Sequence, residues 1–292
     1  MKPAQFEYND PQSVEEALDL LAKYGDACKV LAGGQSLVPL MNFRLARPER
    51  LIDINGIESL THIERENGHL KIGAMVRHSQ LEHSAEVAER WPLLTEAIGW
   101  VGHSQIRNRG TVGGSAAHAD PAAELPAAFA ALDASFHLLS KRGPRVLTWK
   151  EFFVSEFTTA LALDELLTAV EVPEQMASTG SAFVEYARRH GDFALGGAAV
   201  TVKLGRDGRC EEVAIALLSA GPAPVRAEGA ERHLRGTKLD EASIRSAAAE
   251  AVEGLHPTSD IHGSAEYRIG LLHTMTERAL AKAAQRARSN VA

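Results

Sequence analysis

The segment Ala32-Gly33-Gly34-Gln35-Ser36 comes at the end of a short apolar run, residues 28–32, that predicts a buried strand. A second segment of the same kind, Thr111-Val112-Gly113-Gly114-Ser115, follows a polar stretch at residues 105–110. Paired glycines permit a positive φ and leave no Cβ to obstruct a ligand, and successive N–H groups in such turns bind anions. Two such segments that converge in space could hold a pyrophosphate.

Each glycine segment taken alone is also compatible with an ordinary turn. Ser36, Thr111 and Ser115 place hydroxyl donors beside the backbone amides, which favours a ligand site. Neither segment matches the GxGxxG dinucleotide motif or the GxxxxGK(S/T) phosphate loop. The chain also lacks a GxSxG elbow, so its serines are not predicted to be hydrolase nucleophiles.

Length and composition predict a globular protein with more than one packed unit. The chain has 292 residues, which exceeds the size at which a single core grows comfortably, so two or three units are expected. Its 45% apolar and 24% charged residues are ordinary for a soluble protein. The net charge of −7 argues against nucleic-acid binding, because phosphate backbones require a dense Lys and Arg surface.

The two cysteines, Cys28 and Cys210, are too few for an iron–sulfur cluster, which ordinarily needs four thiolate ligands. Their spacing leaves one disulfide open, but two reduced thiols in a cytoplasmic protein are expected. Residues 1–10 contain no apolar signal-peptide core, and no later stretch is long and uninterrupted enough to span a bilayer. We therefore expect a cytoplasmic chain whose membrane association is peripheral at most. The histidines show no compact ligand spacing, so no metal site is predicted.

The hydrophobic pattern predicts alternating strands and helices over roughly the first 170 residues. Ser13, with Glu16 three residues later, resembles a capping box and starts a helix that should end near Gly25. Strands are predicted at residues 28–32, 50–54, 69–74, 135–140, 145–148 and 166–172. Helices are predicted over residues 79–102, with a break at Trp91-Pro92, and over residues 122–133.

The pattern changes after a short polar segment, residues 174–180, which we predict to be a linker. Strands are expected at residues 182–187, 198–204 and 212–218, with an Asp-Gly turn at residues 205–208 between the last two. Residues 227–288 are mostly helical in pattern. Strands and helices that alternate and then segregate predict an α+β fold with a satellite domain.

Several motifs, in order along nearly the whole chain, resemble the medium subunits of the carbon monoxide dehydrogenase and xanthine dehydrogenase type. Residues 32–41 (AGGQSLVPLM), followed by residues 44–48 (RLARP), resemble the first FAD-binding loop of that family. The second FAD-binding loop of the family, with the segment that follows it, is resembled by residues 105–108 (QIRN), 111–114 (TVGG) and 120–126 (DPAAELP). The likeness continues through residues 164–167 (DELL), 188–194 (RRHGDFA) and 263–268 (GSAEYR).

The resemblance implies a two-subdomain α/β FAD-binding domain of the PCMH/VAO type, followed by a C-terminal domain of antiparallel sheet plus helices. The FAD-binding domain is expected at residues 1–176, with subdomains at about 1–55 and 56–176, and the C-terminal domain at residues 177–292. FAD is expected between the two subdomains, and the C-terminal domain is expected to close over one side of the flavin ring.

The resemblance also implies roles for individual residues. The two glycine segments would hold the pyrophosphate, and Glu124 takes the place of an acidic residue, usually Asp, at the adenosine. Leu167 falls beside the adenine, and Phe193 replaces an aromatic residue, often Tyr, at the isoalloxazine. The implied cofactor-binding set is Lys29, Leu31, Ala32, Gly33, Gly34, Gln35, Ser36, Val101, Thr111, Val112, Gly113, Gly114, Ser115, Glu124, Leu167 and Phe193. Ser115 replaces a common Asn, and Phe193 supplies an apolar wall without a hydroxyl.

Other polar residues near these motifs are weaker site candidates. Arg107 and Arg109 flank the second glycine segment and are candidate phosphate counter-charges, although surface arginines usually have no such role. Arg278, Lys282 and Arg286 form a basic stripe that is expected to face solvent, with partner docking as the alternative. Among the histidines, His103 and His118 flank the second segment, and His190 lies near Phe193.

No catalytic triad, paired-carboxylate site or metal site is evident, which favours an electron-transfer subunit over a self-sufficient enzyme. The resemblance implies a small partner with 2Fe–2S clusters and a large partner with a molybdenum cofactor, in a dimer of heterotrimers. The FAD is expected to be noncovalent and to pass electrons to a quinone, a cytochrome, oxygen or NAD. A stand-alone flavoprotein oxidoreductase and a scaffold subunit without FAD remain the alternatives. The substrate of such a complex, whether carbon monoxide, an N-heterocycle, a purine or an aldehyde, is set by the large partner.

Overall fold

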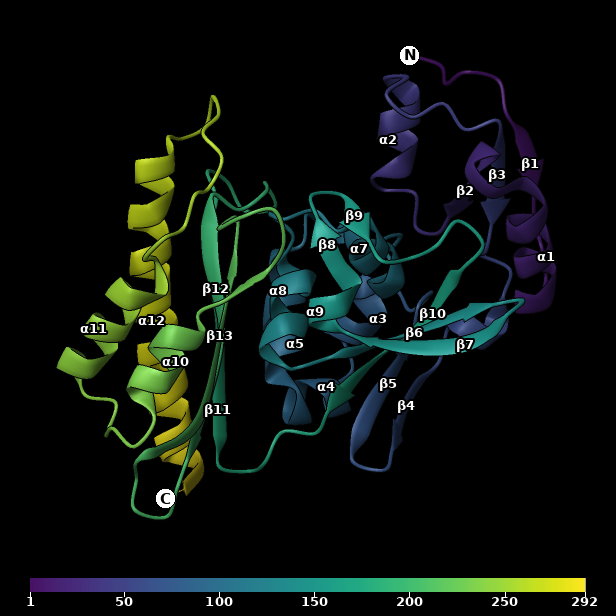
Figure 1. The fold of residues 1–292 in the computed structure, drawn as a ribbon. Helices are drawn as coiled ribbons and strands as arrows, with labels where there is room; N and C mark the ends of the chain where they lie inside the picture. Colours follow the sequence, from purple (N-terminus) through teal and green to yellow (C-terminus); the bar gives the residue numbers. More distant parts are fainter. Residues whose placement is uncertain (292) are drawn as a thin grey trace.

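The computed structural model describes residues 1–291, and its N-terminal part begins with a small parallel sheet (Figure 1). The strands β1 (Glu7–Asn9), β2 (Cys28–Leu31) and β3 (Arg50–Asp53) have the order β1-β3-β2. The helix α1 (Val14–Tyr24) starts and ends as predicted, because Ser13 accepts the Glu16 N–H at 3.2 Å and Gly25 follows. The capping box itself is incomplete, since the Glu16 carboxylate accepts from Gln12 N rather than from Ser13.

A second, five-stranded antiparallel sheet forms the centre of the N-terminal part, in the order β4-β5-β10-β6-β7. Its strands are β4 (Ile63–Glu66), β5 (His69–Gly73), β6 (Ser135–Ser140), β7 (Gly143–Thr148) and β10 (Leu166–Pro173). The β6–β7 hairpin was predicted, whereas β4 was missed because it is charged and almost fully exposed. The last two residues of the predicted linker belong to the next strand, which begins at Thr179.

Short helices connect and cover these strands. They are α2 (Leu37–Asn42), α3 (His78–Glu82), α4 (Ala85–Arg90), α5 (Pro92–Trp100), α6 (Ser104–Arg107), α7 (Val112–His118), α8 (Glu124–Ala131) and α9 (Trp149–Phe152). The predicted break at Trp91-Pro92 is present, and a second break at His83-Ser84 divides the predicted helix again. Two short strands, β8 (Phe153–Ser155) and β9 (Thr158–Thr159), pair with each other.

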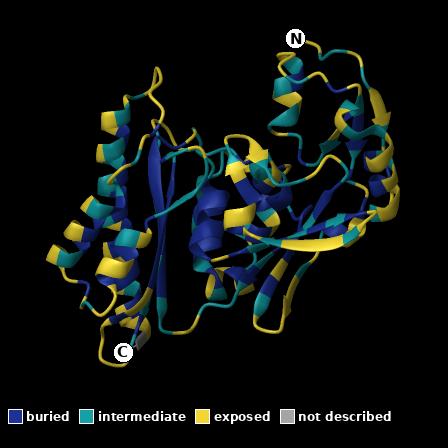
Figure 2. Ribbon diagram, in the orientation of Figure 1, coloured by how far each residue is buried: buried dark blue, intermediate teal, exposed yellow. Residues whose placement is uncertain are grey.

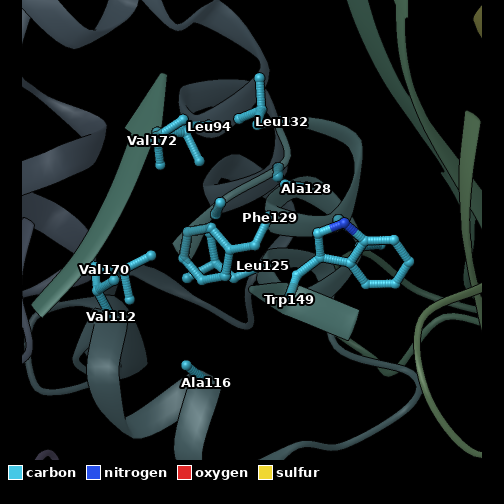
Figure 3. Packing of buried hydrophobic residues seen from close by; sticks show 14 of the residues in the cluster. Leu94, Val112, Ala116, Leu125, Ala128, Phe129, Leu132, Trp149, Val170 and Val172 are labelled. Carbon is cyan, nitrogen blue, oxygen red and sulfur yellow. The ribbon is translucent and has the colours of Figure 1, made fainter. Parts of the chain in front are cut away.

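The apolar helix α8 lies at the centre of the molecule and is buried along its whole length (Figure 2). Phe129 from α8 meets Phe136 edge to face, with ring centroids 5.8 Å apart, and Phe136 stacks on Phe152 at 4.1 Å. The same cluster contains Leu94, Val112 and Val170 (Figure 3). Burial of these aliphatic and aromatic side chains is the main source of stability of this part.

The C-terminal part is an antiparallel sheet with helices on one face. The strands β11 (Thr179–Tyr186), β12 (Gly196–Leu204), β13 (Cys210–Leu218) and β14 (Val225–Arg226) follow one another in the sheet. The helices α10 (Glu228–Leu234), α11 (Glu241–Ala251) and α12 (Ala265–Val291) lie on its outer side (Figure 1). The inner face contributes Phe183, Ala199 and Leu218 to the core around α8, so the two parts share one apolar interior.

Part of the C-terminal basic stripe joins the two parts. The Glu96 carboxylate on α5 lies 2.5 Å from Arg286 and 3.5 Å from Lys282, and it accepts the Phe183 N–H at 3.0 Å. Arg278 is exposed. The stripe thus faces solvent at Arg278 and Lys282, as expected, whereas Arg286 is partly buried because its guanidinium pairs with Glu96.

Both cysteines are free and buried, as expected. Among residues 1–291, none of the helices combines the length and apolar character needed to cross a membrane.

Candidate functional site

The structure brings the two glycine segments together, although almost 80 residues separate them along the chain. A Cβ on Gly33 would lie closer than 3.0 Å to the Arg109 carbonyl oxygen and 2.8 Å from the Gly110 Cα. On the other side of the contact, a Cβ on Gly114 would be 3.7 Å from the Ala32 Cβ. Gly33 is therefore required because another backbone occupies the space of its side chain.

The two segments have different conformations. Gly34 has a φ of +74°, as proposed for a glycine turn, and it precedes α2. Gly113 and Gly114 instead lie in the first turn of α7, whose N-cap Thr111 accepts the Gly114 N–H at 3.1 Å. The positive φ inferred for paired glycines is therefore absent from the second segment. Glycine is required at position 113 for a different reason, because a Cβ there would lie 2.5 Å from the Ala74 Cβ.

A cavity of about 290 Å³ opens beside the first segment. Its lining consists of Leu31, Gly33, Gly34, Gln35, Val38, Pro39, Asn42 and Arg109. We call the two glycine segments, residues 32–36 and 111–115, together with Arg109 the glycine cradle. Ser36 precedes α2 without capping it, which leaves its hydroxyl group available to a ligand.

Of the two predicted counter-charges, only Arg109 faces the cradle. The Arg107 guanidinium donates to Glu82 at 2.8 Å and to the carbonyl groups of Val101 and Gly102, both at 3.2 Å. Its role as a phosphate counter-charge is therefore wrong, because its donors hold α6 against the preceding loop. Arg109 is exposed, lines the cavity and takes part in no ion pair within the described chain.

Arg77, which precedes α3, was missed by the sequence analysis. Its guanidinium donates from Nη1 to the Arg109 carbonyl at 2.6 Å and from Nη2 to Asn55 Oδ1 at 2.6 Å. Asn55 in turn donates from Nδ2 to the Ala32 carbonyl at 2.8 Å. A single side chain is thus connected to the first segment through Asn55 and to Arg109, two residues before the second segment.

His78, the next residue, is also absent from the predicted set. Its Nε2 lies 2.9 Å from the Thr111 carbonyl oxygen and 3.0 Å from Ser115 Oγ. Burial lowers the pKa of His78 to about 4, so the ring is neutral at physiological pH. Nδ1 is buried with no partner among residues 1–291, so the single ring proton lies on Nε2 and is donated to Thr111. Ser115 Oγ faces this donor as an acceptor, and its own proton is available to a ligand.

Several predicted residues lie outside the cavity lining. Lys29 is exposed on β2, and Val101 caps the C-terminus of α5. Leu167 on β10 is buried in the core around α8. Phe193 is 65% exposed in the loop between β11 and β12, so it is free to contact a ligand or a partner.

The loop that carries Phe193 rests on the C-terminal end of α5 and the segment after it. His190 stacks on Trp100, with ring centroids 5.2 Å apart, and a Cβ on Gly191 would lie 2.5 Å from the His103 ring. His118 instead packs on Phe157 at 5.1 Å, and burial lowers its pKa. His103 and His190 therefore have structural contacts that hold this loop in place.

Two glutamates, Glu124 and Glu185, are buried, and only Glu124 is among the predicted site residues. Burial, with a smaller contribution from the charge of Asp120, raises the pKa of Glu124, at the start of α8, to about 7. Burial and, second, the charge of Glu124 together raise the pKa of Glu185, on β11, to about 8. Both carboxyl oxygens of Glu185 are buried and lack a hydrogen-bond partner in the described structure. We call Glu124 and Glu185 the carboxyl pair.

The glycine cradle has the donors and space that a diphosphate requires. Gly33 and Gly34 line the cavity without a Cβ, Ser36 and Ser115 offer hydroxyl groups, and Arg109 supplies a positive charge that has no ion-pair partner among residues 1–291. The residues present therefore fit the pyrophosphate of a dinucleotide. In residues 1–291, no group of three or more His, Cys, Asp or Glu side chains is arranged to hold a metal ion.

Comparisons with known proteins agree with this geometry. Residues 4–175 match the FAD-binding domain of molybdopterin dehydrogenases, and residues 181–283 match the CO dehydrogenase flavoprotein C-terminal domain. The chain is 47% identical to 6-hydroxypseudooxynicotine dehydrogenase complex subunit alpha of Paenarthrobacter nicotinovorans, over 99% of this chain and 97% of that protein. It is 42% identical to caffeine dehydrogenase subunit beta of Pseudomonas sp. strain CBB1, over 98% and 97%. The carbon monoxide dehydrogenase structure from Hydrogenophaga pseudoflava has a TM-score of 0.95 at 40% identity, covering 98% of this chain and 99% of that one.

Proposed function

The chain belongs to the FAD-binding subunits of the molybdopterin dehydrogenases, and we propose that it binds FAD noncovalently and relays electrons from a partner's iron–sulfur cluster to an external acceptor. The observation that carries this proposal is the meeting of two distant glycine segments in one cradle beside Arg109, an exposed arginine that lines the cavity. When bound, FAD supplies the redox chemistry, because its ring accepts and returns electrons.

The residues of the chain orient the cofactor. The backbone N–H groups of residues 33–36 would face the pyrophosphate, and Ser36 and Ser115 would donate to its oxygens. The N–H groups of residues 112–115 already donate within the chain, so the second segment contributes through the Ser115 hydroxyl. His78 keeps Ser115 in the required orientation through its Nε2 proton. Arg109 balances the negative charge of the two phosphates.

Further contacts belong to the same proposal. We assign Glu124 to the adenosine side, Leu167 to the adenine and Phe193 to the flavin ring, with Lys29, Leu31 and Val101 along the ligand path. The FAD-binding unit spans residues 1–176 and the C-terminal unit residues 177–292. The separate sheets, β1–β10 on one side and β11–β14 on the other, support this division.

The proposal that this chain has partner subunits is supported by its relatives, whose names describe subunits of dehydrogenases. We propose a small iron–sulfur subunit and a large molybdenum subunit, assembled as a dimer of heterotrimers. The stand-alone alternative would need an acid or base that faces a substrate. The carboxyl pair does not meet this need, since the Glu185 oxygens are closed off from solvent.

The test is anaerobic stopped-flow reduction of the flavin, followed by its visible absorbance. The isolated chain should not be bleached by heterocycles, aldehydes or carbon monoxide, and addition of the two partner subunits should start the reaction. Bleaching of the lone chain at about 1 s⁻¹ or faster, an ordinary rate for a complete enzyme, would refute the relay. Acid precipitation should release all flavin as free FAD, whereas flavin retained on the polypeptide would refute noncovalent binding.

A further inference from the structure

Arg77 occupies an unusual position between the two halves of the glycine cradle. Its backbone pairs with the second segment as an isolated bridge to Thr111, and His78 N donates to the Gly110 carbonyl at 3.0 Å. Its side chain then reaches the Arg109 carbonyl and, through Asn55, the Ala32 carbonyl. The chain of hydrogen bonds thus runs from the second segment to the first.

The Asn55 link is itself held in one orientation. The Asn55 N–H donates to Asp53 Oδ1 at 2.9 Å, and Asp53 also accepts the Tyr8 hydroxyl proton at 2.6 Å. The Asn55 amide accepts from Arg77 through Oδ1 and donates to Ala32 through Nδ2, so rotation of the amide would break both bonds. Arg77 therefore contacts a fixed acceptor rather than a mobile one.

The acceptors of Arg77 are neutral. A carbonyl and an amide oxygen receive its two short hydrogen bonds, and among residues 1–291 the guanidinium has no ion-pair partner. Burial lowers the pKa of Arg77, the charge of Arg109 lowers it further, and the charge of Asp53 raises it. Two arginines thus keep positive charge at the cradle, where an anion would offset their repulsion.

We propose that Arg77 is the positioning residue that sets the spacing of the two glycine segments, and thereby the preference for a diphosphate that contacts both. The inference rests on the proposed function and adds one residue to it. A planar guanidinium with several donors can join two acceptors in fixed geometry, which the single ammonium group of lysine cannot. A monophosphate that contacts one segment depends on this spacing much less.

The experiment measures binding of FAD, ADP and AMP to the full chain after removal of its flavin, by calorimetry. The wild-type chain should bind ADP more tightly than AMP because the second phosphate reaches the second segment. Arg77→Lys keeps the positive charge but loses the paired hydrogen bonds to Asn55 and to the Arg109 carbonyl. Asn55→Ala removes the link between Arg77 and Ala32 while both arginines remain in place. Each should reduce the ADP preference by about tenfold, the loss expected for one hydrogen bond to a charged group.

Arg65→Met is the matched control. Arg65, on β4, pairs with Glu174 after β10, and its loss should leave the preference unchanged. Melting temperatures of all variants show whether they fold. A lower melting temperature with an unchanged ADP preference would show that Arg77 is only structural and would overturn the inference. A wild-type chain that binds FAD but does not prefer ADP over AMP would also overturn it. A wild-type chain that binds neither FAD nor ADP would instead refute the proposed function.

Discussion

Replacement of Glu185 by glutamine tests the carboxyl pair through the pH dependence of stability. In the folded chain the pKa of Glu185 is raised to about 8 by burial and by the charge of Glu124, whose own carboxyl lies near Asp120. The unfolded chain has the ordinary value of 4.5. At a pH between these two pKa values, Glu185 in the native state retains a proton that it has released in the unfolded state. The protein therefore loses stability as the pH rises through this range.

The magnitude follows from linkage. One retained proton corresponds to about 1.4 kcal/mol for each pH unit, so between about pH 5 and about pH 7 the group should cost about 2.5 kcal/mol. Glutamine does not ionise, and the variant should lack this part of the slope. Its unfolding free energy should therefore fall less steeply with pH than that of the wild type.

The assay is urea unfolding of the flavin-free chain at several pH values in this range, followed by far-UV circular dichroism. Glu66→Gln, on the exposed strand β4, is the control and should follow the wild-type curve. Parallel curves for wild type and Glu185→Gln would refute the reasoning, because they would mean that Glu185 is ionised in the folded protein. The difference in slope is the measured quantity, since a buried amide also changes packing.

Three other substitutions test the cradle and the junction of the two parts. Gly33→Ala should lower flavin content, measured by visible absorbance, because the new Cβ would collide with the Arg109 carbonyl. Gly99→Ala is the control and should not change flavin content, because the space around Gly99 is open. Equal flavin content in the two variants would contradict this prediction. His78→Leu should weaken FAD binding about tenfold in a fluorescence titration, because Thr111 and Ser115 lose their donor, and His78→Gln should restore part of it. Glu96→Ala should lower the unfolding free energy by about 1–2 kcal/mol through loss of the partly exposed Arg286 pair, and an unchanged value would show that the junction is apolar alone.

Local patterns were sufficient to predict the family, the fold class and most strands. The hairpins at β6–β7 and β12–β13 follow from turn residues next to apolar runs, and α1 follows from Ser13 and Gly25. These features depend on neighbours within a few residues. The exposed strand β4 has no such pattern, because its pairing with β5 rather than its own composition makes it a strand.

The residues around the cradle could be predicted only in part. The glycines are visible in the sequence, but the bridge from Arg77 to Asn55 spans 22 residues and that from Arg77 to Arg109 spans 32. Tertiary packing alone sets such distances. The carboxyl pair did leave a signal, since Glu185 and Glu124 are isolated charges in otherwise apolar segments, and a buried charge of this kind requires an explanation.

The two halves of the glycine cradle are linked through Asn55 and Arg77. The segment that carries Arg77 is itself anchored by the hydrogen bond from Ala74 N to the Thr168 carbonyl on β10. During synthesis, the first glycine segment leaves the ribosome long before this anchor exists. A nascent chain that ends ahead of β10 would therefore lack the geometry to retain FAD, however abundant the flavin. FAD would therefore bind late in synthesis. Flavin uptake by ribosome-bound chains of increasing length should begin only after β10 has emerged from the ribosome.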